Sequence, residues 1–244
     1  MRTIKYLVIQ FKNEIGFQEL RKFRGAVVEA AGREHVLFHN HEEDKFRYSY
    51  PLIQYKRIDG KAALVCLEEG IHEVHAFFQG KAQVLNLDGR VITPAVERLT
   101  MREITMSVGD DKHAYRISNW LALNQEHYRE WQRMPNESES RRFLMTILRG
   151  NLLSMAKGLG WRIDREVIVD LHHIGLSRPT RFKEQTLASF DAGFYSNIRL
   201  PQHLGLGKGA ALGYGMVGPD KQAAPPTRAI AAEEQSEMPG ETGV

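Results

Sequence analysis

A glycine-rich stretch at residues 205–215, GLGKGAALGYG, constrains this chain more than any other feature. It contains two G-x-G units separated by five residues, and Lys208 lies between them. Glycine accepts positive φ and lets another backbone approach closely, and a dense glycine run leaves backbone N–H groups that can bind anions. The stretch therefore predicts a loop that lies against a phosphate backbone or against a packed neighbour.

Two nucleotide-binding motifs compete for this stretch. The phosphate-binding motif G-x-x-x-x-G-K-[ST] is absent, because Gly209 follows Lys208. The dinucleotide-binding motif G-x-G-x-x-[GA] fits residues 205–210, but it requires a following helix, a second strand and an acidic residue about 20 positions on. The chain runs instead into Gly218-Pro219 and a segment rich in proline, alanine and glutamate. A loop that binds nucleic acid remains as the third interpretation.

Composition limits the class of protein. With 244 residues the chain suits one large domain or two small ones, and its net charge of +3 means that a nucleic-acid surface must come from local clusters of lysine and arginine. The single cysteine, Cys66, excludes an internal disulfide and a cysteine metal site. Because no signal peptide or long apolar span is visible, we expect a soluble, cytoplasmic protein without a membrane partner.

The order of the expected elements predicts an α+β fold of two tandem ferredoxin-like (RRM-like) domains with a C-terminal glycine-rich loop. In the first half, periodicity predicts helices at 17–31 and 68–79 and strands at 3–11, 46–56, 62–67 and 82–87. The second half begins with a strand at 98–108 and contains a loop at 135–140 followed by a long helix. We expect domains at 1–92 and 93–217. Residues 218–244 have too few large apolar side chains to bury a core and predict a disordered tail.

Three histidines lie close together in the sequence, at positions 35, 39 and 41. On an extended segment His39 and His41 would point to one face, about 6–7 Å apart at their Cα atoms. One imidazole could then accept a proton while the other donates one, as RNA cleavage by the 2′-OH requires. A zinc site that includes His35 and plain packing are the alternatives. Tyr48 and Lys45 are close enough in sequence to assist by stabilising charge.

A second basic cluster could bind phosphates without reading sequence. It would form a strip of the following residues: Arg178, Arg181, Lys183, Arg199 and Lys208. Aromatic residues that interleave with it could stack on bases or belong to the core. These are Phe182, Phe190, Phe194, Tyr195 and Tyr214.

The chain resembles the CRISPR-associated repeat-processing endoribonucleases of the Cas6 family, and among them the Cas6b subgroup. The resemblance rests on the glycine signature at 205–215, on LFHNH at 37–41, on YPLIQYK at 50–56 and on GNLLSMAKGLGW at 150–161. The resemblance extends over about residues 1–217, and the segment beyond has no counterpart in the family.

The resemblance implies two tandem ferredoxin-like domains and an enzyme that cuts precursor CRISPR RNA within each repeat. The products would be a 2′,3′-cyclic phosphate and a 5′-OH, formed without metal or cofactor. The catalytic candidates carried over are His39, His41 and Tyr48, whereas the assisting lysine does not carry over cleanly. The glycine loop implies RNA binding by Gly207, Lys208 and Gly209, and the rest of the signature is included with them: Gly205, Gly213 and Gly215.

Partners and alternatives complete the hypothesis. The repeat RNA is the expected partner, and other subunits of a CRISPR effector or a homodimer stay open. A non-catalytic RNA-binding subunit would share the fold and the glycine loop without needing His39 and His41. A metal-dependent enzyme or a nucleotide-binding oxidoreductase would need ligands or a βαβ unit that the sequence does not offer.

Overall fold

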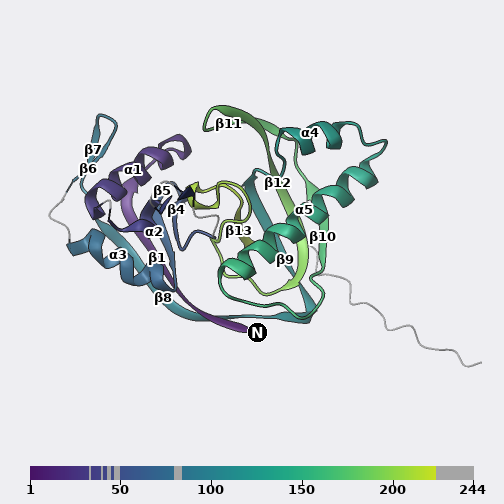
Figure 1. Cartoon of the computed structure of the whole chain (residues 1–244), viewed down its shortest axis with the longest axis horizontal. Helices are drawn as coiled ribbons and strands as arrows, with labels where there is room; N and C mark the ends of the chain where they lie inside the picture. The colour runs from purple at the N-terminus through teal and green to yellow at the C-terminus, as the bar shows by residue number, and fades with distance from the viewer. Residues whose placement is uncertain (33, 40, 43–44, 47–49, 80–83, 224–244) are drawn as a thin grey trace, which may run out of the picture.

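The computed structural model describes residues 1–223 except 33, 40, 43–44, 47–49 and 80–83. Figure 1 shows two halves side by side, each with an antiparallel sheet and its own helices. The predicted α+β class with two tandem ferredoxin-like domains is confirmed. Among the described residues, none of the helices combines the length and the apolar composition needed to cross a bilayer.

The N-terminal sheet has the strand order β4-β5-β1-β8, and every pairing in it is antiparallel. Numbered within the domain, this is the order 2-3-1-4 of a β-α-β-β-α-β unit. Helices α1 and α3 cover one face, where Phe11, Phe23 and Phe77 meet. The bounds are β1 Arg2–Glu14, α1 Leu20–Ala31, β4 Ile53–Ile58, β5 Lys61–Leu67, α3 Glu69–Gln79 and β8 Val96–Met106.

The prediction that a strand at 82–87 closes this sheet is wrong. Its described part, β6 (Leu85–Leu87), forms a separate hairpin with β7 (Arg90–Ile92) around a turn at Asp88-Gly89. The sheet is closed by β8, which pairs with β1 from Arg2↔Met106 onward. The sequence prediction placed this strand, expected at 98–108, in the second domain because the strand expected at 82–87 already completed the first β-α-β-β-α-β pattern. We propose Ser107, directly after β8, as the domain boundary in place of residue 92.

The C-terminal sheet has the order β10-β12-β9-β13, with β11 paired to the outer part of β12. This is again the ferredoxin-like order, but no α-helix lies between β12 and β13. The glycine-rich stretch occupies that place and forms only a short 3-10 turn at Ala210–Leu212. The bounds are β9 Val108–Trp120, α4 Gln125–Gln132, α5 Glu137–Gly158, β10 Val169–Ile174, β11 Arg178–Phe182, β12 Gln185–Ile198 and β13 Met216–Pro219.

Two ends of elements differ from the sequence prediction. Helix α5 begins at Glu137, inside the predicted loop 135–140, because the Asn136 side chain accepts a bond from the N–H of Glu139 at 2.9 Å and caps the helix. Gly218 and Pro219 do not belong to a tail but pair with β9 as the end of β13. A proline is tolerated there because β13 is an edge strand. The N–H of Asp220 also donates to the carbonyl of Ala114 at 3.1 Å, so the tail predicted at 218–244 is ordered at its start, and its residues 224–244 lie outside the described part of the chain.

The hydrophobic core of the C-terminal domain also includes side chains of the N-terminal sheet. Along β1, Leu7 and Ile9 point to the N-terminal helices, whereas Ile4 and Tyr6 point the other way and join the core of the C-terminal domain. Side chains of successive strand residues point to opposite faces, so one strand can serve both cores. The second face of the N-terminal sheet is therefore the surface on which the C-terminal domain packs.

Candidate functional site

The glycine-rich stretch lies against strand β4 of the N-terminal domain, in the middle of Figure 1. Tyr50 Oη donates to the carbonyl of Gly205 at 2.8 Å, and the N–H of Gly205 donates to Gln54 Oε1 at 2.9 Å. Lys56 Nζ donates to the carbonyl of Ala210 at 2.8 Å. Three polar side chains of the segment 50–56 thus bond to residues 205 and 210, the two ends of the first half of the loop.

The glycines of this stretch permit close packing rather than an open row of N–H groups. A Cβ on Gly215, whose φ is +60°, would lie 2.0 Å from the carbonyl oxygen of Leu206, and the N–H of Leu206 donates to the carbonyl of Gly215 at 2.9 Å. The N–H of Leu212 donates to Gly209 at 2.7 Å. The N–H groups of Leu206 and Leu212 therefore bond within the protein and are not available to a phosphate, whereas anion binding by Gly207, Lys208 and Gly209 stays a prediction.

Exposure divides the predicted RNA-binding residues of the loop into two groups. Gly205, Gly213 and Gly215 are buried, where they shape the loop, and their predicted contact with RNA is not tested by this burial. Lys208 is exposed, and Gly207 and Gly209 are half-buried beside it. RNA contact by these last three residues stays a prediction.

The predicted basic strip forms only in part. Lys208 Nζ lies 5.7 Å from the ring centroid of Phe182, at the end of β11. Exposed Arg178 and Arg181 lie on β11, and exposed Lys183 lies in the turn that follows. Arg178 also pairs with Asp191 at 2.5 Å, so part of its charge is already neutralised. The hairpin and Lys208 together present a basic surface.

Arg199 does not belong to this surface. It follows the last residue of β12, and its N–H bonds to Ser107 at 2.9 Å, whereas the β11–β12 turn is at the other end of the strand. A strand of 14 residues spans roughly 45 Å. Of the interleaved aromatic residues, Phe190 and Phe194 are buried in the core, while Tyr214 packs edge-on against Phe182 and Phe17.

The histidine segment is not one extended strand, contrary to the sequence prediction. His39 is the last residue of the short helix α2 (Val36–His39), and His41 begins β2 (His41–Glu42), which pairs with β3 (Lys45–Phe46). The side chains of His39, His41 and Lys45, and all of Tyr48, lie outside the part of the chain that is described. Their catalytic roles stay predictions.

The backbone directly before His39 is held by the N-terminal core. Buried Phe38 accepts a hydrogen bond at its carbonyl from Tyr55 Oη at 3.0 Å, and His35 Nδ1 lies 2.7 Å from Glu73 Oε2 of α3. His35 is therefore tied to α3. In the described ranges, no group of three or more histidine, cysteine or acidic residues could hold a metal ion.

Strand β4 thus joins the two candidate segments. Tyr55 points to the helix side and holds α2, whereas Gln54 and Lys56 point to the opposite side and hold the glycine loop. The sequence analysis did not single out Gln54 or Lys56 by function. Their signal was present, since two polar residues at i and i+2 of a strand lie on one face and can indicate that this face meets a polar partner.

Lys56 is the most unusual electrostatic group of the site. Its side chain is fully buried, and this burial lowers its pKa from 10.5 to about 7. Burial and the nearby Lys56 also lower the pKa of His203. A cation without a charged partner in such a place costs free energy, so the fold favours the neutral amine.

The free energy of unfolding should therefore depend on pH through Lys56. Between about pH 7 and about pH 10.5 the unfolded chain binds one proton more than the folded chain, so this group makes stability rise with pH. The difference between wild type and Lys56→Met should change by up to about 1.4 kcal/mol per pH unit in that window. Urea denaturation at several pH values measures it, with exposed Lys208→Met as the control. Parallel curves for wild type and Lys56→Met would contradict the assignment.

Comparison with known proteins places the whole described chain in one family. The model of the Cas6b N-terminal domain matches residues 2–105, and that of the Cas6b C-terminal domain matches residues 107–219. A crystal structure of Cas6b is 26% identical, with a TM-score of 0.81 over 90% of this chain and 100% of that one. A crystal structure of the CRISPR RNA processing endoribonuclease Cas6b is 25% identical, with a TM-score of 0.69 over the same shares. An uncharacterized protein of Methanocaldococcus jannaschii is 28% identical over 54% of this chain and 90% of its own length.

Proposed function

Because this chain belongs to the Cas6b family, we propose that it is the endoribonuclease that cuts precursor CRISPR RNA within its repeats to release guide RNAs. The proposal includes the chemistry. The 2′-OH of the cut nucleotide attacks the adjacent phosphorus, and no metal ion takes part. The products are a 2′,3′-cyclic phosphate and a 5′-OH.

The observation that carries the proposal is the position of β4 between two segments. One face of this strand holds the glycine loop with exposed Lys208, and the other holds the residue before His39. A cation on a glycine loop suits contact with phosphates, and paired imidazoles suit proton transfer near neutral pH. The glycine loop and the residue before His39 are therefore both bonded to the same strand, which supports binding and cleavage of one RNA.

In the proposed reaction, one of His39 and His41 removes the proton of the 2′-OH. The 2′-oxygen forms a bond to phosphorus while the bond from phosphorus to the 5′-oxygen breaks. The other histidine, protonated at the start, gives its proton to the departing 5′-oxygen. Tyr48, and Lys45 as a weaker candidate, would stabilise negative charge on the phosphoryl oxygens. Protons balance, and no water is consumed.

A 2′-deoxy substitution at the cut nucleotide should abolish cleavage, because it removes the nucleophile, while binding stays close to that of the unmodified RNA. Cleavage of the unmodified repeat should persist in excess EDTA. Gel analysis of end-labelled repeat RNA measures both, and a 2′-deoxy nucleotide one position away is the control. Activity lost in EDTA and restored by a divalent ion would overturn the metal-independent mechanism. Binding without any cleavage would favour a non-catalytic RNA-binding subunit.

A further inference from the structure

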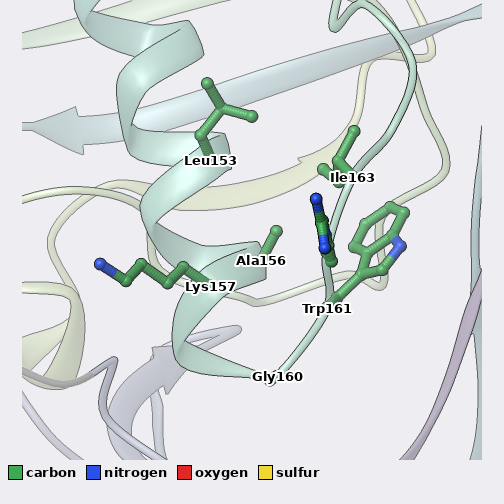
Figure 2. Close-up of a pocket in the computed structure, with 7 residues that line it drawn as sticks. Leu153, Ala156, Lys157, Gly160, Trp161 and Ile163 are labelled. Atoms are coloured by element: carbon green, nitrogen blue, oxygen red, sulfur yellow. The ribbon is translucent and has the colours of Figure 1, made fainter.

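A hollow of about 370 Å³ lies beside the C-terminal end of α5 (Figure 2). Helix α5 forms one wall and the segment that follows it forms the other, as Figure 2 shows for Ala156 and Ile163, while the Lys157 side chain extends away from Trp161. The residues that give it its character are Leu153, Ala156, Lys157, Trp161, Arg162 and Ile163. Among the described residues, none of the glycine loop or of the histidine segment contributes to its lining.

The hollow combines apolar surface with two uncompensated charges. Leu153 is 44% exposed, and Ile163 is half-buried opposite it. Lys157 and Arg162 are exposed, and neither forms an ion pair with any described residue. A second hollow, nearer the N-terminal end of α5, differs in charge, because its Arg149 lies 3.5 Å from Glu166 and forms an ion pair with it. The first hollow is thus suited to a ligand that is both flat and apolar on one side and anionic on another.

The hollow lies close to the chain that follows the histidine segment. Gly158, the residue after Lys157, packs so closely on Tyr50 that an added Cβ would lie 2.2 Å from the Tyr50 Cβ. Tyr50 comes two residues after Tyr48 and bonds to the glycine loop through Gly205. The end of α5 therefore touches the chain where the histidine segment returns to β4.

We propose that this hollow binds one nucleotide of the repeat RNA, next to the cut position, with its base on Leu153 and Ile163 and its two flanking phosphates at Lys157 and Arg162. This inference rests on the proposed function. Pockets of about 300–1,000 Å³ take small ligands, so the volume admits one nucleotide. Contact of a base with apolar surface and of phosphates with lysine and arginine tolerates any sequence, and it strengthens binding while fixing the position of the strand.

The first test is the double variant Lys157→Ala/Arg162→Ala. Its Kd for a non-cleavable 2′-deoxy repeat RNA should rise about ten-fold, and the slope of log Kd against log salt should fall by about two, one for each lost phosphate contact. The matched control is Arg142→Ala/Arg149→Ala on the same helix, which should keep the wild-type slope. Both double variants change exposed residues, and their melting temperatures verify that they fold.

The second test locates the base. A series of repeat RNAs, each with one abasic nucleotide, should contain one position near the cut where loss of the base weakens binding to wild type about ten-fold. In the Leu153→Ser variant, the same abasic position should weaken binding little further, because the apolar contact with the base is already lost. Wild type that does not bind repeat RNA would overturn the proposed function together with this inference. Wild type that binds, with an unchanged double variant or no abasic position coupled to Leu153, would overturn the nucleotide site alone.

Discussion

Replacing either His39 or His41 with alanine is expected to lower the single-turnover rate of repeat cleavage by about 10²–10⁴-fold, the usual contribution of a general acid or base. Binding should persist, because a neutral imidazole adds little to the attraction of phosphates. The wild-type rate should pass through a maximum with pH, since one ring must be neutral and the other protonated. Quench-flow or manual time courses at saturating enzyme measure the rate, and filter binding measures the affinity.

A sulfur atom in place of the 5′-oxygen separates the two roles. A thiolate leaves without needing a proton, so this RNA should restore cleavage to the variant that lacks the acid and not to the variant that lacks the base. His75→Ala is a suitable control, because His75 is an exposed histidine of α3 on the same domain. If both alanine variants keep rates within a few-fold of wild type, the pair is structural and the non-catalytic interpretation becomes the better one.

The sequence could predict the ferredoxin-like domains because most of their strands alternate between a core face and another face. It predicted a strand at 98–108 but not that this strand closes the first sheet, since most of its side chains are exposed and its partners on β1 are 85 to 104 residues away. The short apolar run at 82–87, which precedes β8 in the sequence, matched the alternation expected of a strand better. Pairing across the chain, rather than local pattern, decided which strand completed the sheet.

In the candidate site, too, local sequence pattern predicts one part and contacts between distant residues decide the other. The glycine signature and the histidine pair were visible as local motifs, and so was the exposed cation Lys208. Their positions depend on Gln54, Lys56 and Tyr55, whose partners are 151, 154 and 17 residues away. A lysine in a strand gives no local sign that it will be fully buried against a carbonyl of a distant loop. The sequence supplied the candidate residues, and tertiary contacts decide where the glycine loop and the residue before His39 lie.

Gly215→Ala is expected to destabilise the protein by about 3–5 kcal/mol and to weaken repeat binding. Two costs add at this position. An alanine at φ +60° is in the left-handed region, and its Cβ would lie 2.0 Å from the carbonyl oxygen of Leu206, which is backbone and cannot rotate away. The bond between Leu206 and Gly215 would have to open, and it lies next to the Gly205 bonds to Tyr50 and Gln54.

Gly150→Ala is the matched control, because it makes the same chemical change at a glycine inside α5 where an added Cβ meets nothing within 4 Å. Alanine is the better helix former by about 1 kcal/mol, so this variant should be more stable than wild type. Urea denaturation of the three proteins measures the difference. If Gly215→Ala unfolds within 1 kcal/mol of wild type, then the loop can move off β4 at little cost, and the two fixed segments proposed for RNA cleavage would not be held on one strand.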